Sequence, residues 1–461
     1  MMSTQQPAFI FPLVIGCFTA VTYVFFVVVY TVQPTEFIDE IYHIPQAQKY
    51  CDGRFQEWDP KITTLPGLYL FSIGLNGPVS WVLGRKLCDV FSLRITNLVA
   101  TAFMLSTIHK LLLYLHGDKV DHWKLMLSAV NLSLLPVMYW FTFLYYTDVL
   151  STLIVLVMIL LHLYRAPNAA GAMGVIAIIM RQTNIIWVGF LFVHLAADVL
   201  GAKVLKAPVI TFTDVKMLMK KLKKIAHTKP HRLVEVLTDV VFDCFSYGAV
   251  LLLFLLFVYY NGSIVVGDRK AHEATVHIPQ IGYFCLFYLL FSLPYAPSYV
   301  RPFVKLCKKN MLLAASVMVT GIMIVHSNTL VHPYLLADNR HYTFYLWNKL
   351  YGRFSFVKYV MVPLYMFGAY MVHASIQNRN FIFKILFLGC VIASIVPQKL
   401  LEFRYFIIPF LMARLQNVSN SWWHLGIETV YFLLINALTL YIFVGKTFYW
   451  EDLPEPQRII W

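Results

Sequence analysis

The chain has 461 residues, of which 59% are hydrophobic and only 13% carry a formal charge. A soluble domain has about 45–50% apolar and about 25% charged residues, so this composition excludes an ordinary soluble protein and predicts a polytopic membrane protein. The net charge of +14 could suggest a nucleic-acid partner. Most of the excess lies in short connections between apolar runs, however, and membrane topology explains that placement better.

Apolar runs recur along the whole chain, and crossing a bilayer takes roughly 20 such residues. We therefore predict an all-α polytopic fold with about a dozen transmembrane helices. The candidate spans are residues 8–32, 90–115, 123–141, 149–164, 169–180, 185–200, 241–260, 278–295, 311–325, 356–372, 381–396, 403–415 and 429–444.

One further apolar segment, residues 65–83, does not fit a simple span. It is interrupted by Pro66, Gly67, Gly74, Gly77 and Pro78. Irregular backbone at membrane depth survives only when it is buried in protein or lines a cavity. We therefore predict that this segment is re-entrant or interfacial.

Acidic residues follow the first apolar run directly. Asp39 and Glu40 lie just beyond the predicted membrane edge, and Pro45 is expected to set up the first turn of a short helix. Apolar residues recur there at three- or four-residue spacing, which is typical of an amphipathic helix lying in the interface. The acidic pair has two interpretations. It is either a solvated loop or a general base at the mouth of a membrane cavity, within hydrogen-bond reach of the proton it takes.

Basic residues concentrate in one connection. Residues 202–235 hold nine Lys or Arg against two acids, so the positive-inside rule places this segment in the cytosol. Counting from a cytosolic N-terminus, with residues 65–83 not crossing, places one set of residues on the opposite side: Asp39, Asp148, Arg181, Asp268, Asp338 and Glu402. The predicted organisation is an N-terminal module (1–200) with a first non-cytosolic loop (33–89), a basic cytosolic loop (201–240), and a C-terminal module (241–461) with non-cytosolic loops at 261–277 and 326–355.

The non-cytosolic side gathers ionisable residues around the entrances of the predicted spans. Each one alone could be an interfacial anchor or half of a buried ion pair. Together they form a rim of acids and bases, and ionisable groups at membrane depth are usually functional. The candidate site residues are Asp39, Glu40, Asp148, Arg181, Asp268, Arg269, His272, His277, Asp338, Arg340, His341, Glu402 and Arg404.

Seven cysteines are scattered along the chain, mostly within apolar runs, and no CxxC pair occurs. This pattern predicts neither a zinc site nor a disulfide framework. The carboxylates are dispersed as well, so we expect no metal site and no cofactor.

Seven blocks of sequence, in order along nearly the full length, carry a family resemblance. They are DEIYHIPQAQKYC (39–51), WDPKITTLPGLYL (58–70), LYYTD (144–148), RQTNIIW (181–187), GDRKAHEATVHIPQ (267–280), LLADNRHYTFYLW (335–347) and VPQKLLEFRYFIIP (396–409). The chain resembles the dolichyl-phosphate-glucose-dependent alpha-1,2-glucosyltransferases of dolichol-linked oligosaccharide assembly. The resemblance implies a multi-pass endoplasmic-reticulum membrane enzyme of the GT-C type, with a lumenal active site. It also implies a dolichyl phosphate glucose donor and a diglucosylated, dolichyl-diphosphate-linked oligosaccharide acceptor, used for protein N-glycosylation.

The implied chemistry assigns a base. A beta-linked donor and an alpha-linked product mean inversion, so one direct displacement needs one base on the attacking side. Asp39 corresponds to the acidic residue that GT-C enzymes carry in the first lumenal loop, and it is our candidate base. Glu40 is the second choice.

The remaining roles concern the departing phosphate and the acceptor. Arginine suits the phosphate because it donates bidentately to that group. The phosphate candidates are Arg340, His341 and Arg404, followed by Arg269. The candidates for orienting the acceptor sugar are His272 and His277. A transporter or channel-associated subunit is an alternative interpretation, since polar groups within spans can line a solute path. The sequence shows no inverted repeat that would support it.

Overall fold

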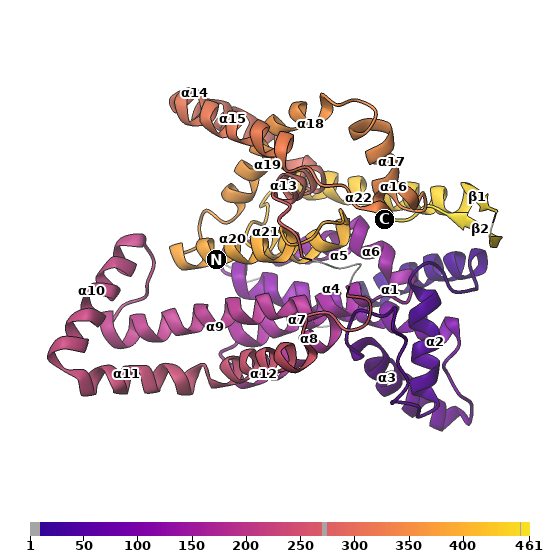
Figure 1. The fold of residues 1–461 in the computed structure, drawn as a ribbon, viewed down its shortest axis with the longest axis horizontal. Helices are drawn as coiled ribbons and strands as arrows, with labels where there is room; N and C mark the ends of the chain where they lie inside the picture. Colours follow the sequence, from indigo (N-terminus) through magenta and orange to yellow (C-terminus); the bar gives the residue numbers. More distant parts are fainter. Residues whose placement is uncertain (1–9, 270–273, 452) are drawn as a thin grey trace.

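Helices dominate the structure, a computed structural model that describes residues 10–269, 274–451 and 453–461 (Figure 1). The prediction of an all-α fold is confirmed, with one small β-hairpin near the C-terminus. The first helices are α1 (Ile10–Val32), α2 (Glu40–Cys51), α3 (Gly67–Leu83), α4 (Val90–His116), α5 (His122–Ser133), α6 (Pro136–Trp140), α7 (Thr147–Leu163), α8 (Pro167–Met180) and α9 (Ile185–Leu200). The next are α10 (Phe212–Thr228), α11 (Pro230–Asp243), α12 (Phe245–Asn261), α13 (Pro279–Phe291), α14 (Ala296–Lys309) and α15 (Met311–Ser327).

The C-terminal part continues with shorter helices and ends in two strands. The helices are α16 (Pro333–Ala337), α17 (Tyr342–Leu346), α18 (Val357–Val360), α19 (Val362–Ser375), α20 (Phe381–Ile395), α21 (Ile407–Arg414) and α22 (Trp422–Gly445). Short 3-10 or π-helical turns connect several helices: η1 (Phe141–Phe143), η2 (Gln182–Asn184), η3 (Gly201–Leu205), η5 (Leu293–Tyr295), η6 (Trp347–Tyr351) and η7 (Phe403–Phe406). The antiparallel strands are β1 (Thr447–Trp450) and β2 (Leu453–Arg458).

Helices that can cross a membrane are present, but fewer than a dozen are long enough on their own. Among the described residues, four helical segments are long and apolar enough, or seven if each of three bent pairs counts as one span. The break between α5 and α6 shows why, because the chain bends there by 62° just before Pro136. Proline lacks a backbone donor and clashes with the preceding turn, so it ends a helix.

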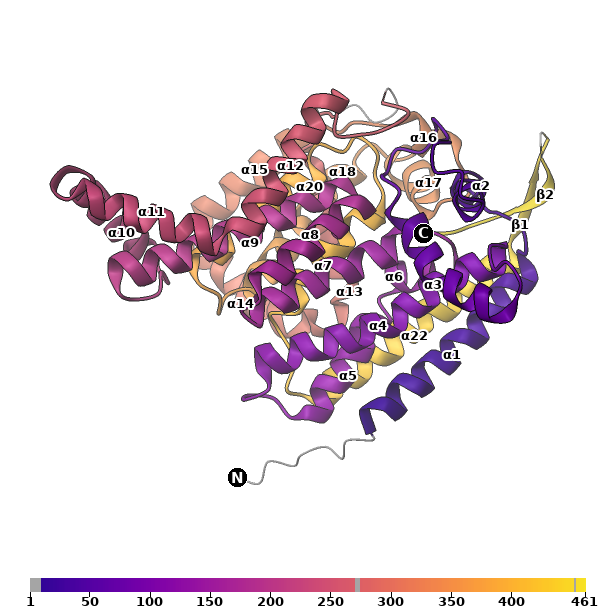
Figure 2. The same cartoon turned by 90° about the horizontal axis from the view of Figure 1, so that it is seen from below.

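Contacts between segments far apart in sequence define two ends of the helical bundle. At one end the backbone N–H of Asp39 donates to the hydroxyl of Tyr146 over 3.1 Å. At the other end the ring of His116 is hydrogen-bonded to the carbonyl of Leu415 over 2.8 Å. We call these the Asp39 end and the Leu415 end. Figure 2 shows α2, α3 and the two strands at one end of the molecule and α10 and α11 at the other.

The helix after the first span differs from the sequence prediction. Pro45 was expected in the first turn, whereas α2 begins at Glu40 and contains Pro45 in its interior. The prediction was wrong because the helix already begins at Glu40, with Asp39 as its N-cap residue, five residues before the proline. One helical turn therefore separates Asp39 from His43, which brings both to the same face.

The interrupted segment 65–83 is the 17-residue helix α3, Gly67–Leu83. Its first residue lies against the end of α8, where a Cβ on Gly67 would come within 2.6 Å of the carbonyl oxygen of Ile179. Only glycine allows this approach, since any side chain would overlap the backbone. The glycine that interrupts the apolar pattern thus serves a helix contact.

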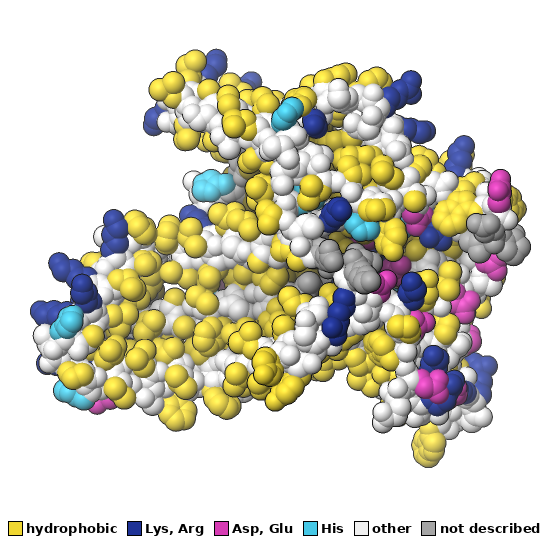
Figure 3. All heavy atoms as spheres, in the orientation of Figure 1, with side chains coloured by type: hydrophobic (Ala, Val, Ile, Leu, Met, Phe, Trp, Pro, Cys, Tyr) yellow, Lys and Arg dark blue, Asp and Glu magenta, His cyan; other side chains and the backbone are white. Residues whose placement is uncertain are grey.

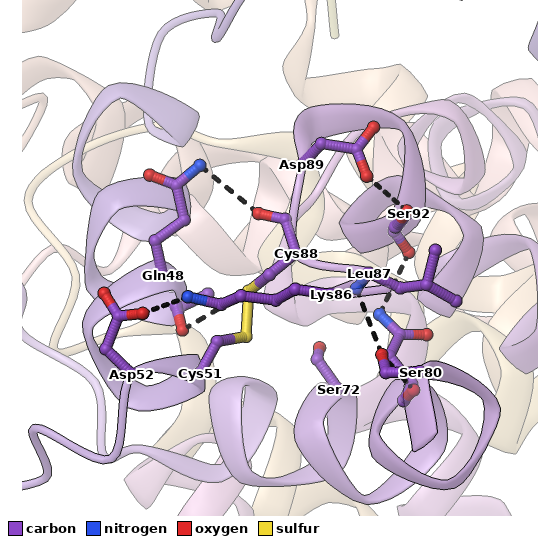
Figure 4. The surroundings of a disulfide bond; sticks show 12 residues. Gln48, Cys51, Asp52, Ser72, Ser80, Lys86, Leu87, Cys88, Asp89 and Ser92 are labelled. Carbon is purple, nitrogen blue, oxygen red and sulfur yellow. Dashed lines mark hydrogen bonds and ion pairs between the residues drawn. A yellow bond between two sulfur atoms is a disulfide. The ribbon is translucent and has the colours of Figure 1, made fainter. Parts of the chain in front are cut away.

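A disulfide joins Cys51, the last residue of α2, to Cys88, just before α4 (Figure 4). The prediction of no disulfide framework was wrong at this pair. The two cysteines are 37 residues apart and form no motif, so only the folding of α2 and α3 into one unit brings them together. Lys86 and Asp52 form an ion pair beside the bond, and Gln48 Nε2 donates to the Cys88 carbonyl over 3.3 Å.

The predicted basic loop 201–240 is largely helical. Helices α10 and α11 form an arm that projects from the bundle in both ribbon views. Its small apolar core consists of Val204, Val209, Leu218 and Val236. Figure 3 shows Lys and Arg side chains gathered over this arm, whereas Asp and Glu side chains gather at the side of α2 and the strands. The charge asymmetry read from the sequence is thus an asymmetry between the two ends of the molecule.

Candidate functional site

Five of the predicted site residues meet at the Asp39 end, from separate parts of the chain. Arg404 Nη1 lies 3.2 Å from Asp39 Oδ2 and 3.6 Å from Asp148 Oδ2. The same guanidinium reaches Glu402 Oε2 through Nη2, at 2.8 Å. Arg181 Nη1 lies 2.5 Å from Asp148 Oδ1 and completes the group. We call these five residues the Arg404 cluster.

The local backbone directs the side chains of the cluster. Asp39 follows Ile38, whose φ of 56° lies in a region that is strained for a β-branched residue. Such strain costs on the order of 1–3 kcal/mol and collects at functional sites. Asp148 lies in the first turn of α7, and Arg181 has extended backbone where α8 ends and η2 begins. Helix ends therefore present both side chains to the same place.

The cluster is unevenly exposed. The Asp39 side chain is 40% exposed, whereas that of Asp148 is only 1% exposed. Burial alone would raise the pKa of Glu402, but the Arg404 guanidinium outweighs burial and holds this pKa below its usual value. Three carboxylates and two guanidinium groups give the cluster a formal charge of −1. One open carboxylate thus lies beside a pair of fixed cations.

Aromatic residues and a histidine complete the surroundings, and the sequence did not single them out as site residues. The rings of Phe141 and Tyr146 lie 5.6 and 5.5 Å from Arg404 Cζ, within the range of cation–π attraction. His43 Nδ1 lies 2.5 Å from the hydroxyl of Tyr69. Burial lowers the pKa of His43, although the nearby Asp39 carboxylate opposes that shift. The four-residue spacing between Asp39 and His43 could have indicated this neighbour.

Glu40 is buried and has a different environment from Asp39. Its Oε1 accepts from Arg94 Nε over 2.8 Å, and its Oε2 accepts from Arg94 Nη2 over 2.5 Å. The backbone N–H groups of Phe37 and Tyr145 also donate to it, and both charged side chains are fully buried. Arg94 was not among the predicted site residues. A lone charged residue inside a predicted span usually has a partner, so its position could have indicated this ion pair.

Three other predicted residues, Asp338, Arg340 and His341, lie together in the loop between α16 and α17. Arg340 donates to Asp338 through Nε over 2.9 Å and through Nη2 over 2.8 Å. This bidentate contact outweighs the effect of burial and holds the pKa of Asp338 below its usual value. Arg340 Cζ also lies 4.5 Å from the ring centre of Trp450. Trp461 links this group with the Arg404 cluster, because its carbonyl oxygen lies 3.2 Å from His341 Nδ1 and its ring centre lies 5.8 Å from that of Phe403.

Three predicted residues lie apart from the Arg404 cluster. Asp268 is 4.0 Å from Lys61, and Arg269 Nη2 donates to the carbonyl of Asn261 over 2.6 Å. His277 is buried, and its Nε2 accepts from the backbone of Leu330 over 3.3 Å. The hydrogen bonds and ion pairs of the described residues join none of these three to the cluster.

His272 lies outside the described residues. Within the described part of the chain, no group of three or more His, Cys, Asp or Glu side chains could hold a metal ion. The carboxylates of the Arg404 cluster are instead paired with guanidinium groups.

The fold and the cluster define a class: a helical membrane protein with a partly open carboxylate–arginine site at one end of the bundle. Residues 33–415 match the DIE2/ALG10 family. The chain belongs to this family, and the match includes the whole Arg404 cluster.

Curated relatives extend over nearly the whole chain. It is 38% identical over 445 residues to the "Dol-P-Glc:Glc(2)Man(9)GlcNAc(2)-PP-Dol alpha-1,2-glucosyltransferase" of Rattus norvegicus, with 92% of this chain and 93% of the relative covered. The protein of the same name from Mus musculus is 39% identical over 458 residues, and that from Drosophila melanogaster is 36% identical over 429 residues, both with the same coverage. No solved structure matches the chain.

Proposed function

We propose that this protein transfers glucose from dolichyl phosphate glucose to the diglucosylated, dolichyl-diphosphate-linked oligosaccharide, forming the terminal alpha-1,2 linkage used in N-glycosylation. The observation that carries this proposal is the Arg404 cluster, in which an open carboxylate lies beside two arginines at one end of a membrane-spanning bundle. Family membership and the printed names of the relatives support the choice of donor and acceptor. Those names describe transferases, and they give the transporter alternative no support.

The proposed fold is of the GT-C type, with the Asp39 end in the lumen of the endoplasmic reticulum. Two independent features support this orientation. The Cys51–Cys88 disulfide closes the unit of α2 and α3, which Figure 2 shows at one end of the molecule, and disulfides persist in oxidising compartments such as this lumen. The basic arm of α10 and α11 lies at the opposite end, as the positive-inside rule requires for a cytosolic segment. On this arrangement residues 1–200 and 241–461 form the two transmembrane modules on either side of the arm.

Asp39 is the proposed general base. Its Oδ2 contacts Arg404, while Oδ1 has no hydrogen bond among the described residues, and the side chain is partly exposed. A base must come within hydrogen-bond reach of the acceptor hydroxyl, and only an accessible oxygen can do so. Glu40 is the weaker candidate because both of its oxygens are occupied by Arg94 and backbone donors inside the protein.

The reaction needs one displacement. The 2-hydroxyl oxygen of the acceptor glucose attacks C1 of the donor glucose, the C1–O bond to phosphate breaks, and Asp39 takes the hydroxyl proton. Dolichyl phosphate departs with the electron pair of the broken bond. Attack from the face opposite the phosphate converts a beta-linked donor into an alpha-linked product.

Arg404 and Arg181 are the proposed ligands of the departing phosphate. Charge-assisted hydrogen bonds from arginine are strong and directional. Arg181 uses only Nη1 for Asp148, and its other side-chain nitrogens have no hydrogen bond among the described residues. Arg340 is less suited than the sequence suggested, since Asp338 and Trp450 already hold its guanidinium group. We propose that Arg340 orders its loop and that His341 faces the donor side of the site.

The test is glucose transfer by the purified protein reconstituted in lipid. Synthetic dolichyl phosphate glucose and a diglucosylated lipid-linked acceptor should yield a product extended by one alpha-1,2-linked glucose. Dolichyl phosphate mannose, and an acceptor that already carries the third glucose, serve as matched controls and should give no product. Failure of transfer by folded protein, or equal use of the control substrates, would contradict the proposal.

A further inference from the structure

The chain segment after α22 folds back across the Asp39 end of the molecule. Strands β1 and β2 pair antiparallel, with Thr447 opposite Arg458 and Trp450 opposite Leu453. Figure 2 shows the two strands on the same side of the molecule as α2. The sequence did not indicate on which side of the membrane this segment lies, whereas its contacts place it beside the Arg404 cluster.

One set of contacts fixes the segment to the ends of two long helices. Arg458 Nη1 donates to the carbonyl oxygens of Phe443 over 2.8 Å and Val444 over 3.1 Å, at the end of α22. Thr35, just after α1, donates to Glu455 Oε2 over 3.1 Å. The side chain of Arg458 is largely buried, so these bonds form in surroundings where water competes weakly.

A second set of contacts fixes the loop that carries Arg340 and His341. The backbone N–H of Ile460 donates to the Arg340 carbonyl over 2.7 Å, and the N–H of Tyr342 donates to the Ile460 carbonyl over 3.0 Å. These two bonds make a short parallel bridge between the loop and the tail. The tail also bonds side chains of the loop, since Trp450 Nε1 donates to Asn339 Oδ1 over 2.9 Å.

Trp461 connects this loop with the Arg404 cluster. Its ring centre lies 4.8 Å from that of Tyr342 and 5.8 Å from that of Phe403, the residue before Arg404. Its carbonyl oxygen lies 3.2 Å from His341 Nδ1. The indole therefore packs between the loop that carries Arg340 and His341 and the segment that carries Arg404.

We propose that residues 447–451 and 453–461 form a lumenal strap that holds the loop of His341 beside the segment of Glu402 and Arg404, with Trp461 as the positioning residue. The inference rests on the proposed function, because it assigns the strap a role in binding the donor's sugar phosphate. Trp461 does not touch the reacting atoms. It fixes the distance between the loop and the cluster, and a misplacement of about 1 Å at such a site can cost up to roughly 10²-fold in rate.

The first test compares Trp461→Ala, Trp461→Phe and Tyr449→Ala in the glucose-transfer assay. Tyr449 belongs to the same hairpin and is 70% exposed, so its variant is the matched control. We expect Trp461→Ala to raise the KM for dolichyl phosphate glucose about tenfold or more with a smaller change in kcat. Trp461→Phe should restore most of the KM, and Tyr449→Ala should match the parent protein. An unchanged donor KM in Trp461→Ala, with or without a lower melting temperature, would overturn the positioning role.

The second test needs no activity and separates the strap from the proposed function. Trypsin cleavage after Arg340, followed by mass spectrometry on the detergent-purified protein, reports how firmly the loop is held. Cleavage there should be several-fold faster in Trp461→Ala than in Trp461→Phe or Tyr449→Ala, relative to cleavage at exposed arm residues such as Lys221. Equal cleavage rates in all three variants would overturn the strap. Absence of glucose transfer by the parent protein, with the cleavage difference intact, would refute the proposed function alone.

Discussion

The two ends of the bundle each contain a cluster of ionised side chains, and the two clusters differ in access. At the Leu415 end, Arg414 Nη2 lies 2.7 Å from Glu428 Oε1, and the Tyr295 hydroxyl donates to Glu428 Oε2 over 2.7 Å. Asn131 donates to the same Oε2 over 3.1 Å. Both charged side chains are almost completely buried. We call these four residues the Glu428 cluster.

The comparison shows that side-chain type does not by itself distinguish a partly open cluster from a closed one. Both oxygens of Glu428 are occupied, and the cluster joins α5, η5, α21 and α22 across the sequence. In the Arg404 cluster, by contrast, the Asp39 side chain is 40% exposed and keeps one oxygen free of hydrogen bonds to described residues. A carboxylate that is sealed by donors stabilises helix packing, whereas an accessible one can receive a proton from a substrate.

The largest expected effect is a loss of glucose transfer when Asp39, in the Arg404 cluster, is replaced. Asp39→Asn keeps the size and polarity of the side chain but cannot take a proton. Glucose transfer should fall by about 10²–10⁴-fold while the melting temperature and donor binding stay near those of the parent protein. Steady-state transfer and donor binding, measured on the same preparation, check this.

Glu40→Gln is the control for loss of the neighbouring charge. It should mainly lower thermal stability, because it weakens the buried contact with Arg94. Near-normal transfer by Asp39→Asn, or a loss confined to Glu40→Gln, would move the base away from Asp39.

The second prediction concerns the stability of the Glu428 cluster. Glu428→Ala leaves the Arg414 charge buried without a partner, which typically costs about 3–5 kcal/mol. We expect a clearly lower midpoint in thermal unfolding of the detergent-purified protein. The molecules that stay folded should keep a kcat close to that of the parent. A normal melting temperature combined with lost transfer would reverse the roles of the two clusters.

A third, smaller effect is expected from the Cys51–Cys88 disulfide, which joins the last residue of α2 to the segment before α4. Cys51→Ser, Cys88→Ser and the double variant each remove a crosslink between residues 37 positions apart. Loss of such a bond typically costs about 2–4 kcal/mol. Chemical unfolding of the three variants should therefore show the same loss, with no further loss on adding reductant. Additive losses from the single variants would indicate that the cysteines act independently.

The smallest predicted effects come from a pair of matched exchanges. Arg404→Lys and Arg414→Lys both keep the charge but remove the planar fork that lets arginine contact several oxygens at once. Arg404→Lys should reduce transfer about tenfold with little change in melting temperature, since a charge-assisted hydrogen bond contributes about 1.5–3 kcal/mol. Arg414→Lys should show the opposite pattern. Equal changes in glucose transfer and in melting temperature for the two variants would contradict the distinction between the two clusters.

The sequence by itself determined the class of the protein and indicated the residues of the Arg404 cluster. Apolar runs require helices in a membrane, because only internally hydrogen-bonded backbone is stable there. Asp39, Asp148, Arg181, Glu402 and Arg404 were all expected on one side of the membrane, from a count of spans between basic connections. The structure brings these five together through contacts of their own side chains.

Only the tertiary structure decided which of the two adjacent acids is open. Asp39 and Glu40 differ by one position, and their environments depend on Arg94 and Arg404, which are 54 and 364 residues away from Glu40 in sequence. The same holds for the Cys51–Cys88 disulfide and for the contact of Trp461 with His341, since neither follows a local pattern. Local periodicity and charge predict which side of a membrane a residue faces. Partners that are distant in the chain are set by helix packing, because burial is a property of the assembled bundle and not of a single segment.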